Sequence, residues 1–245
     1  MAERITVTKS GGVADVKLSR ADKMNALDDA MFSALLQTAE ELAKDESVRC
    51  VVMSGEGRAF CAGLDMGNFG KMAEGTGGTP AGKQKLEPRT HGVALGGGFQ
   101  VMLGSDIRIV HPETKLSIME IKWGLVPDMA GTPIMRSLCR DDRLRELTYT
   151  GRIFSGVEAA DYGFATEISD NPYVRAMEMA KLIAGKNPDA IRADKQIFNN
   201  LADMTDAEAL LQESVLQDKL IGSKNQIEAI MAELGTRPAN FTDGR

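Results

Sequence analysis

Residues 91–99 read HGVALGGGF, and this short stretch constrains the fold more than any other part of the chain. Three consecutive glycines, Gly96 to Gly98, separate a short apolar run from a segment whose apolar residues have helical spacing. Glycines at this point allow close approach of another group to the backbone and leave N–H groups free at the positive end of a helix dipole. The pattern fits a binding turn, and it also fits a tight packing corner between a strand and a helix.

A second small-residue turn, RAFCAGLDM at residues 58–66, follows an apolar run at 49–54 that is typical of a buried strand in a largely parallel sheet. By itself this turn indicates only a tightly folded backbone. Two such turns at strand ends can aim two backbone N–H groups at one carbonyl oxygen and so form an oxyanion hole. Loss of one donor from such a site typically costs about 3–4 kcal/mol of transition-state stabilisation.

The remaining periodicity predicts a mixed α/β chain whose last third is helical. Alternating residues on both sides of Gly11-Gly12 predict a β-hairpin over 5–18. A helix is expected after Asp28 as its N-cap, with Met31, Leu35 and Leu42 on one face. A helix from Gly98 is expected to lead into a strand at 107–109. Another strand is expected at 116–119, with helices at 132–139, 141–149, 156–162, 173–185, 189–201 and 206–232. Residues 66–90 hold six glycines and two prolines, which predicts a long surface loop.

Composition excludes several classes of function. The net charge of −6 with no basic block argues against nucleic-acid binding, and no apolar run is long enough to span a membrane. Three cysteines (Cys50, Cys61 and Cys139) without CxxC spacing predict neither a disulfide framework nor a zinc site. With only His91 and His111 available, catalysis is expected to rely on carboxylates and backbone amides. We therefore expect a cytoplasmic protein without a metal.

Two acidic residues, Glu120 and Asp128, bracket the apolar stretch IKWGLVP. Carboxylates in such surroundings would have raised pKa values and could exchange protons with a substrate. The alternative is a surface glutamate beside a strand and an aspartate that N-caps a helix at Met129. Separately, residues 77–84 nearly match a phosphate-binding loop, but Gln84 stands where a Ser or Thr should hold magnesium, so a plain loop is favoured.

These segments, in this order, resemble the crotonase or enoyl-CoA hydratase/isomerase family. The matching stretches are RADKMNALDDAMF, RAFCAGLDM, HGVALGGGF, SDIRIV, MEIKWGLVPDMAGT and GRIFSGVEAADYGFATEI, and together they cover nearly the whole chain. The resemblance implies an α/β fold with a crotonase-like ββα spiral core at 1–186 and a helical C-terminal trimerisation region at 187–245. It also implies a homotrimer or hexamer.

The resemblance further implies an acyl-CoA thioester substrate and an enolate-like intermediate. The backbone N–H groups of Leu64 and Gly97 would hold the thioester oxygen. Ala62, Asp65 and Met66 fall where the family's backbone meets the CoA adenine, and Met24 lies where an early helix borders the adenosine. CoA is part of the substrate, and no metal or redox cofactor is implied.

The acidic positions depart from the hydratase pattern. Gln100 occupies the position of one hydratase glutamate, whereas Glu120 matches the other. Asp128 falls where dienoyl-CoA isomerases carry an aspartate. The favoured hypothesis is therefore proton-shuttling isomerisation of an unsaturated acyl-CoA, with Glu120 at the α-carbon and Asp128 as the distal acid or base. The alternatives are an enoyl-CoA hydratase that uses Glu120 alone and a non-catalytic paralogue that binds acyl-CoA or a protein partner.

One further departure concerns the segment before His91. In the family a helix and a strand, roughly 17 residues by mean element lengths, precede the triple glycine, and here they appear missing near residues 90–91. Either the chain is truly shortened, or the sequence omits residues. We favour the second explanation, which predicts a break between consecutive Cα atoms somewhere between Gly70 and Gly92.

Overall fold

The computed structural model describes residues 3–65, 67 and 92–243. The expected loop at 66–90, the phosphate-loop near-match and the predicted chain break lie outside these residues, apart from residue 67 and Gly92. Within the described part, no helix is long and apolar enough to cross a membrane.

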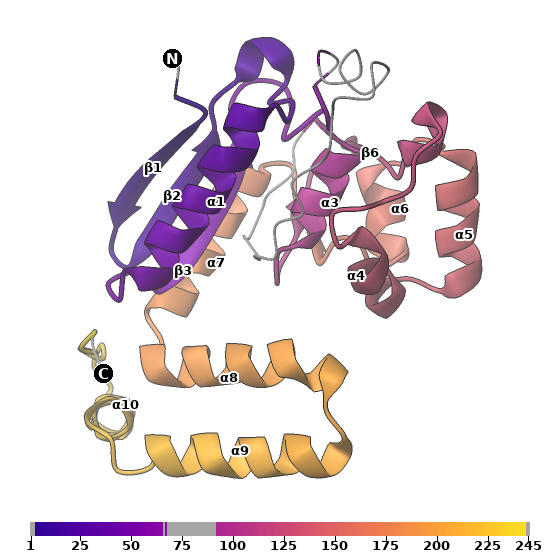
Figure 1. Cartoon of the computed structure of the whole chain (residues 1–245). Coiled ribbons are helices and arrows are strands. Elements are labelled where there is room, and N and C mark those ends of the chain that lie inside the picture. Colours follow the sequence, from indigo (N-terminus) through magenta and orange to yellow (C-terminus); the bar gives the residue numbers. More distant parts are fainter. Residues whose placement is uncertain (1–2, 66, 68–91, 244–245) are drawn as a thin grey trace.

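The N-terminal sheet forms as the alternation predicts (Figure 1). Strands β1 (Ile5–Ser10) and β2 (Val13–Leu18) are antiparallel, and β3 (Cys50–Gly55) pairs with β2 in parallel. Successive side chains of β2 face opposite sides. Val16 packs in the cluster that includes helix α1 (Asp29–Lys44), whereas Val13 packs with helix α7 (Pro172–Ala184). The sheet is therefore covered by a helix on each face.

Helix α1 begins where the sequence predicts. The Asp28 side chain accepts a 2.8 Å hydrogen bond from the backbone N–H of Met31, and this cap satisfies one of the unpaired donors of the first turn. The expected stripe of Met31, Leu35 and Leu42 is buried. Before α1, a short 3-10 helix η1 (Ala21–Lys23) ends at Met24, which adopts a left-handed conformation with φ of 51°.

After β3, two pairs of short strands and the glycine turn lie near an aromatic cluster. Strand β4 (Val93–Leu95) leads into helix α3 (Gly97–Leu103), and it pairs in parallel with β6 (Lys115–Ser117). Strand β5 (Ile109–Val110) pairs in parallel with β7 (Glu167–Ile168). Phe99 of α3 makes edge-on contacts with Phe154 and Phe164, at centroid distances of 5.7 and 5.3 Å. All three rings are buried, and they anchor the helix that follows the glycines.

The remaining helices follow the predicted order. After the 3-10 helix η2 (Glu120–Trp123) come α4 (Gly131–Leu138), α5 (Asp141–Thr150) and α6 (Gly156–Asp161), and after α7 come α8 (Pro188–Asn200), the 3-10 helix η3 (Leu201–Asp203), α9 (Asp206–Leu220) and α10 (Lys224–Leu234). The single helix predicted over 206–232 is wrong. Gly222 adopts a left-handed φ of +76° and Ser223 caps α10, so the chain turns between two helices.

The C-terminal helices form a layer beside the rest of the chain, at the bottom of Figure 1. Arg49, next to β3, ties the C-terminal tail to the N-terminal sheet. It pairs with Asp243 at 2.6 Å and donates to the carbonyl oxygens of Ala184 and Phe241 at 3.1 Å. The assignment of 187–245 as a separate trimerisation region stays a prediction.

Candidate active site

One cavity of about 750 Å³ collects the residues that the sequence singled out. Its wall is built from the segment around η1, the turn after β3, the turn after β4, and the segment from η2 to α4. The predicted residues on this wall are Met24, Ala62, Leu64, Asp65, Gly97, Glu120 and Asp128. Met66 lies outside the described residues.

The two glycine turns meet at the centre of this cavity. Cys61 forms an isolated parallel bridge with Ala94, so the chain after β3 runs beside β4. A Cβ atom on Gly63 would lie 2.5 Å from the carbonyl oxygen of Leu95 and 3.7 Å from the backbone nitrogen of Gly97. Gly63 also has a φ of +89°, so both space and conformation require glycine there.

The N–H groups of Leu64 and Gly97 are available for a ligand. Leu27 occupies the other edge of the first turn, since its N–H donates to Gly63 and its carbonyl accepts from Asp65, at 2.8 and 3.0 Å. Gly97 opens α3, where first-turn N–H groups have no partner within the helix. Neither the Leu64 nor the Gly97 N–H donates a hydrogen bond within the part of the chain that the structure describes. Two free donors from touching turns can stabilise an oxyanion.

Asn25 holds the first turn in place from inside the core. Its side-chain oxygen accepts a hydrogen bond from the N–H of Arg20 at 2.8 Å. Its side-chain nitrogen donates to the carbonyl oxygens of Glu56 and Ala59, at 3.0 and 2.8 Å. Asn25 is fully buried and has a left-handed φ of 55°, a conformation that asparagine tolerates better than most residues.

Glu120 is the buried carboxylate of the site. Glu120 is the first residue of η2. Its side chain lies against the glycine turn, since a Cβ atom on Gly96 would be 3.6 Å from Oε1 of Glu120. Gln100 donates from Nε2 to this Oε1 at 2.6 Å. The other oxygen, Oε2, is buried without a hydrogen-bond partner among the described residues. Burial raises the pKa of Glu120, the Gln100 hydrogen bond opposes this rise, and the charge of Asp128 adds to it.

Asp128 lines the same cavity but is exposed, which corrects the expectation that its apolar surroundings would bury it. The stretch between the two acids bulges outward, with Trp123 and Leu125 each 41% exposed and Val126 74% exposed. The alternative role for Asp128 as a helix cap is also wrong. Helix α4 starts at Gly131, and Gln100 accepts its first N–H at 3.1 Å.

The residues expected to meet CoA form a second wall of the cavity. The N–H of Ala62 donates to the carbonyl of Met24 at 2.9 Å, so these two segments are joined directly. Arg20 pairs with Asp65 at 2.5 Å. A hydrogen bond from the Gly67 N–H and this ion pair lower the pKa of Asp65, so the carboxylate is held ionised. It serves to fix the turn, because its charge is neutralised by Arg20.

The supporting roles of Asn25 and Arg20 and the hydrogen bond between Gln100 and Glu120 were not predicted from the sequence. Asn25 carried a local signal, because asparagine tolerates the left-handed conformation better than most residues and lies between the predicted hairpin and the helix that follows Asp28. Arg20 and Gln100 act on groups 45 and 20 residues away, respectively, and no local pattern specifies such pairs.

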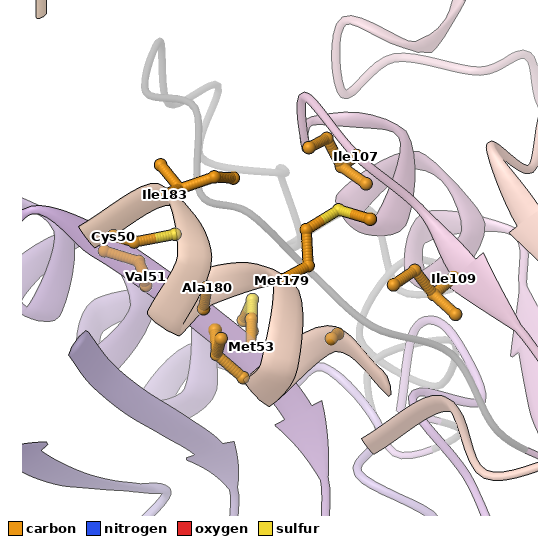
Figure 2. Close-up of a pocket in the computed structure, with 10 residues that line it drawn as sticks. Cys50, Val51, Met53, Ile107, Ile109, Met179, Ala180 and Ile183 are labelled. Atoms are coloured by element: carbon orange, nitrogen blue, oxygen red, sulfur yellow. The ribbon is translucent and has the colours of Figure 1, made fainter. Parts of the chain in front are cut away.

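A second cavity, between β3, the segment leading to β5, and α7, has a different character (Figure 2). Its volume is about 30 Å³, too small for a substrate. The lining side chains carry carbon and sulfur but no oxygen or nitrogen, and they are Cys50, Val51, Val52, Met53, Ile107, Ile109, Ala176, Met179, Ala180 and Ile183. The larger cavity is therefore the candidate active site. In residues 3–65, 67 and 92–243, no three His, Cys, Asp or Glu side chains cluster as a metal site would require.

Comparison with known proteins places this chain in a family. The model of the enoyl-CoA hydratase/isomerase family matches residues 8–86 and 89–244. A 1,2-epoxyphenylacetyl-CoA isomerase of Escherichia coli is 26% identical over 262 residues, covering 99% of each chain. A probable enoyl-CoA hydratase of Mycobacterium tuberculosis is 29% identical over 244 residues, covering 97% of this chain and 98% of its own. The first alignment is 17 positions longer than this chain of 245 residues, whereas the second is not, so the relatives differ in length.

The fold agrees with this assignment. The crystal structure of an enoyl-CoA hydratase from Bacillus anthracis matches with a TM-score of 0.87 at 25% identity, covering 98% of this chain and 99% of that one. The family match spans both glycine turns, both acidic positions and the C-terminal helices. The chain therefore has the α/β crotonase fold and belongs to the enoyl-CoA hydratase/isomerase family.

Proposed function

We propose that this protein isomerises an unsaturated acyl-CoA, most simply a 3,5-dienoyl thioester to its 2,4-dienoyl isomer. The thioester oxygen accepts hydrogen bonds from the N–H groups of Leu64 and Gly97, and Met24, Ala62 and Asp65 border the CoA portion. Glu120 and Asp128 carry the protons. No metal or redox cofactor enters the reaction.

The proposed reaction moves one double-bond system by two proton transfers. Glu120, ionised, removes a proton from C2, and the electrons of the C2–H bond flow toward the thioester oxygen to form a conjugated enolate. Two N–H donors stabilise the negative charge that develops on this oxygen. A proton is then delivered to C6 on the side of Asp128, from its carboxyl or from water beside it, as the double bonds shift. Exchange with solvent returns the proton to Asp128 and removes it from Glu120.

The observation that supports this proposal most directly is the surrounding of Glu120. Its Oε2 atom is buried without a partner among the described residues, and Glu120 lines the same cavity as Leu64 and Gly97. A raised pKa suits a carboxylate that must both accept and release a proton. The reaction needs a second proton carrier, and Gln100 cannot take up a proton. Asp128 is the other carboxyl beside Glu120 on the η2–α4 side of the cavity.

A hydratase that uses Glu120 alone is the second candidate, and the exposure of Asp128 favours it. An exposed Asp128 is also compatible with a non-catalytic binding protein, because an exposed carboxylate carries little desolvation cost. The solved relative from Bacillus anthracis is described as a hydratase, and the Escherichia coli relative as an isomerase.

A paired spectrophotometric assay distinguishes the candidates. One cuvette contains a 3,5-dienoyl-CoA and the other a 2-enoyl-CoA, with Glu120→Gln and Asp128→Asn as variants. The proposal expects turnover of the diene that both variants abolish. Hydration of the enoyl-CoA that survives Asp128→Asn would reject isomerisation in favour of a hydratase. Binding of acyl-CoA without turnover in either cuvette would favour the non-catalytic alternative.

The proposed assembly is a homotrimer or hexamer. Apolar side chains on the C-terminal helices are exposed in the single chain, and burial in an assembly would remove them from water. They include Phe198, Leu201, Leu210, Leu211, Val215, Ile227, Ile230 and Leu234. Light scattering after size-exclusion chromatography gives the mass in solution, and a monomer at micromolar concentration would contradict the proposal.

A further inference from the structure

Gln100 is at the centre of a group of hydrogen bonds that has no part in the proton transfers proposed above. Its side chain is 3% exposed and projects from the first turns of α3 into the space between Glu120 and the start of α4. It makes three hydrogen bonds, one to the carboxylate and two to the backbone. Each of these bonds constrains the others, because an amide has an oxygen that accepts and a nitrogen that donates.

The backbone fixes which way the amide points. The N–H groups of Met129 and Gly131 both donate to Oε1 of Gln100, at 2.9 and 3.1 Å. A flipped amide would bring its NH₂ against two N–H donors and lose both bonds. The NH₂ group must therefore face Glu120, where it donates to Oε1 at 2.6 Å.

This orientation distinguishes the two oxygens of Glu120. Oε1 already accepts a hydrogen bond, and a proton placed on that atom would compete with the amide NH₂ for the same narrow space. Oε2 is buried and has no hydrogen-bond partner among the described residues, so its lone pairs are not engaged by the protein there. Proton exchange is therefore favoured at Oε2.

The same side chain joins Glu120 to the turn that carries Asp128. Helix α4 has Ala130 at its N-cap position, which offers no side-chain oxygen, so the N–H of Gly131 would lack a partner without Gln100. Met129, the other donor, directly follows Asp128 in the chain. One amide thus fixes the position of the buried carboxylate and of the turn that holds the exposed one.

We infer that Gln100 is a positioning residue that fixes Oε1 of Glu120, leaves Oε2 as the oxygen that exchanges protons with substrate, and sets the turn of Asp128 relative to it. The exchange at Oε2 rests on the proposed function, whereas the contact itself does not. A glutamate at this position would accept the same two N–H bonds, but it would place a second carboxylate oxygen against Oε1 of Glu120. The two groups would then have to share a proton.

The test measures the titration of Glu120 directly, by NMR of protein labelled with ¹³C at glutamate carboxyls, with Glu120→Gln to assign the signal. Gln100→Leu removes the donor and the α4 cap, whereas Gln100→Glu keeps the cap and removes the donor. Both variants are expected to raise the pKa of Glu120 by about one pH unit or more, since a hydrogen bond to the ionised form is lost. Met102→Leu, a buried change on the same helix that does not line the cavity, is the control and should leave the titration unchanged.

Gly131→Ala provides a variant in which Gln100 itself is intact. A Cβ atom at residue 131 would lie 2.6 Å from Oε1 of Gln100, so the amide must move. This variant should also raise the pKa of Glu120. The other charged residues of the cavity wall are unchanged in every variant, and they are Asp22, Lys23, Arg58, Asp65, Lys122 and Asp128.

Kinetics supply the second readout. If the wild type turns over an unsaturated acyl-CoA, Gln100→Glu should lower kcat about tenfold at neutral pH while KM changes less than twofold, because the amide orients the base rather than the CoA portion. The rising limb of the pH profile should move upward together with the NMR titration.

The outcomes separate the two proposals. An unchanged Glu120 titration in Gln100→Leu, Gln100→Glu and Gly131→Ala would overturn the positioning role even in an active isomerase. A shifted titration in a protein that isomerises no substrate would support the contact with Glu120 and reject the proposed function.

Discussion

Replacement of Asn25 should lower the free energy of unfolding more than most single substitutions, although Asn25 does not line the cavity. Asn25→Ala removes three hydrogen bonds, to the N–H of Arg20 and to the carbonyls of Glu56 and Ala59, with lengths from 2.8 to 3.0 Å. Each buried group left without a partner costs about 1–2 kcal/mol, and a left-handed alanine adds about 1 kcal/mol. The expected loss is about 4–7 kcal/mol, a large fraction of the typical 5–15 kcal/mol of a folded domain.

Two further variants separate the contributions. Asn25→Gly accepts the φ of 55° without strain, so it should be about 1 kcal/mol more stable than Asn25→Ala. Asn25→Asp keeps the oxygen that accepts from Arg20 but places a carboxylate oxygen against two carbonyl oxygens. It should be the least stable of the three at neutral pH, and acidification that protonates the new carboxyl should recover part of the loss.

Urea unfolding followed by circular dichroism measures these differences, provided that the slope of the transition is the same in all variants. The expected order of stability is wild type, Asn25→Gly, Asn25→Ala and Asn25→Asp. An Asn25→Asp protein as stable as the wild type would show that the side-chain nitrogen does not donate as described, and the account of how the Leu64 turn is held would fail.

Three other outcomes are expected. Glu120→Gln should abolish isomerisation and yet stabilise the protein at neutral pH. The folded protein holds the Glu120 proton more tightly than the unfolded chain, so its stability falls as pH rises through the raised pKa, and the gain in Tm should vanish below the ordinary value of 4.5. Arg49→Ala should release the C-terminal tail to limited proteolysis and cost about 1–3 kcal/mol, whereas Arg140→Ala, whose ion pair is exposed, should change neither. Gly63→Ala should lower kcat/KM at least 100-fold, since its Cβ would strike a carbonyl at 2.5 Å, whereas Gly222→Ala, with open space around it, should affect stability by about 1 kcal/mol and leave turnover unchanged.

Local patterns predicted the parts of the fold that local interactions build. The Asp28 cap and the apolar stripe of α1 depend on residues within a few turns of one another, and both were confirmed. The same holds for the hairpin on both sides of Gly11-Gly12. The break at Gly222-Ser223 was also encoded locally, but helical periodicity continued on both sides and hid it.

The candidate site was predictable where its chemistry is carried by the backbone. The small residues around Leu64 and Gly97 indicated tight turns, and the structure brings the two turns into contact. The environment of the acids was not predictable in the same way. Apolar neighbours suggested burial of both Glu120 and Asp128, but the intervening stretch projects outward, so only Glu120 is enclosed. Which face a loop presents is set by packing between distant segments, and composition does not report it.

The backbone origin of the two proposed oxyanion donors has a consequence for inhibitors and for divergence. Every residue except proline supplies the same N–H group, so exchange of the side chain at Leu64 leaves the donor in place. A compound whose oxygen accepts from both groups would therefore be difficult to evade by resistance mutations, because escape would require the path of the main chain to change. For the same reason, related proteins can replace the acidic residues and acquire another reaction while the same backbone N–H groups remain to bind a thioester oxygen.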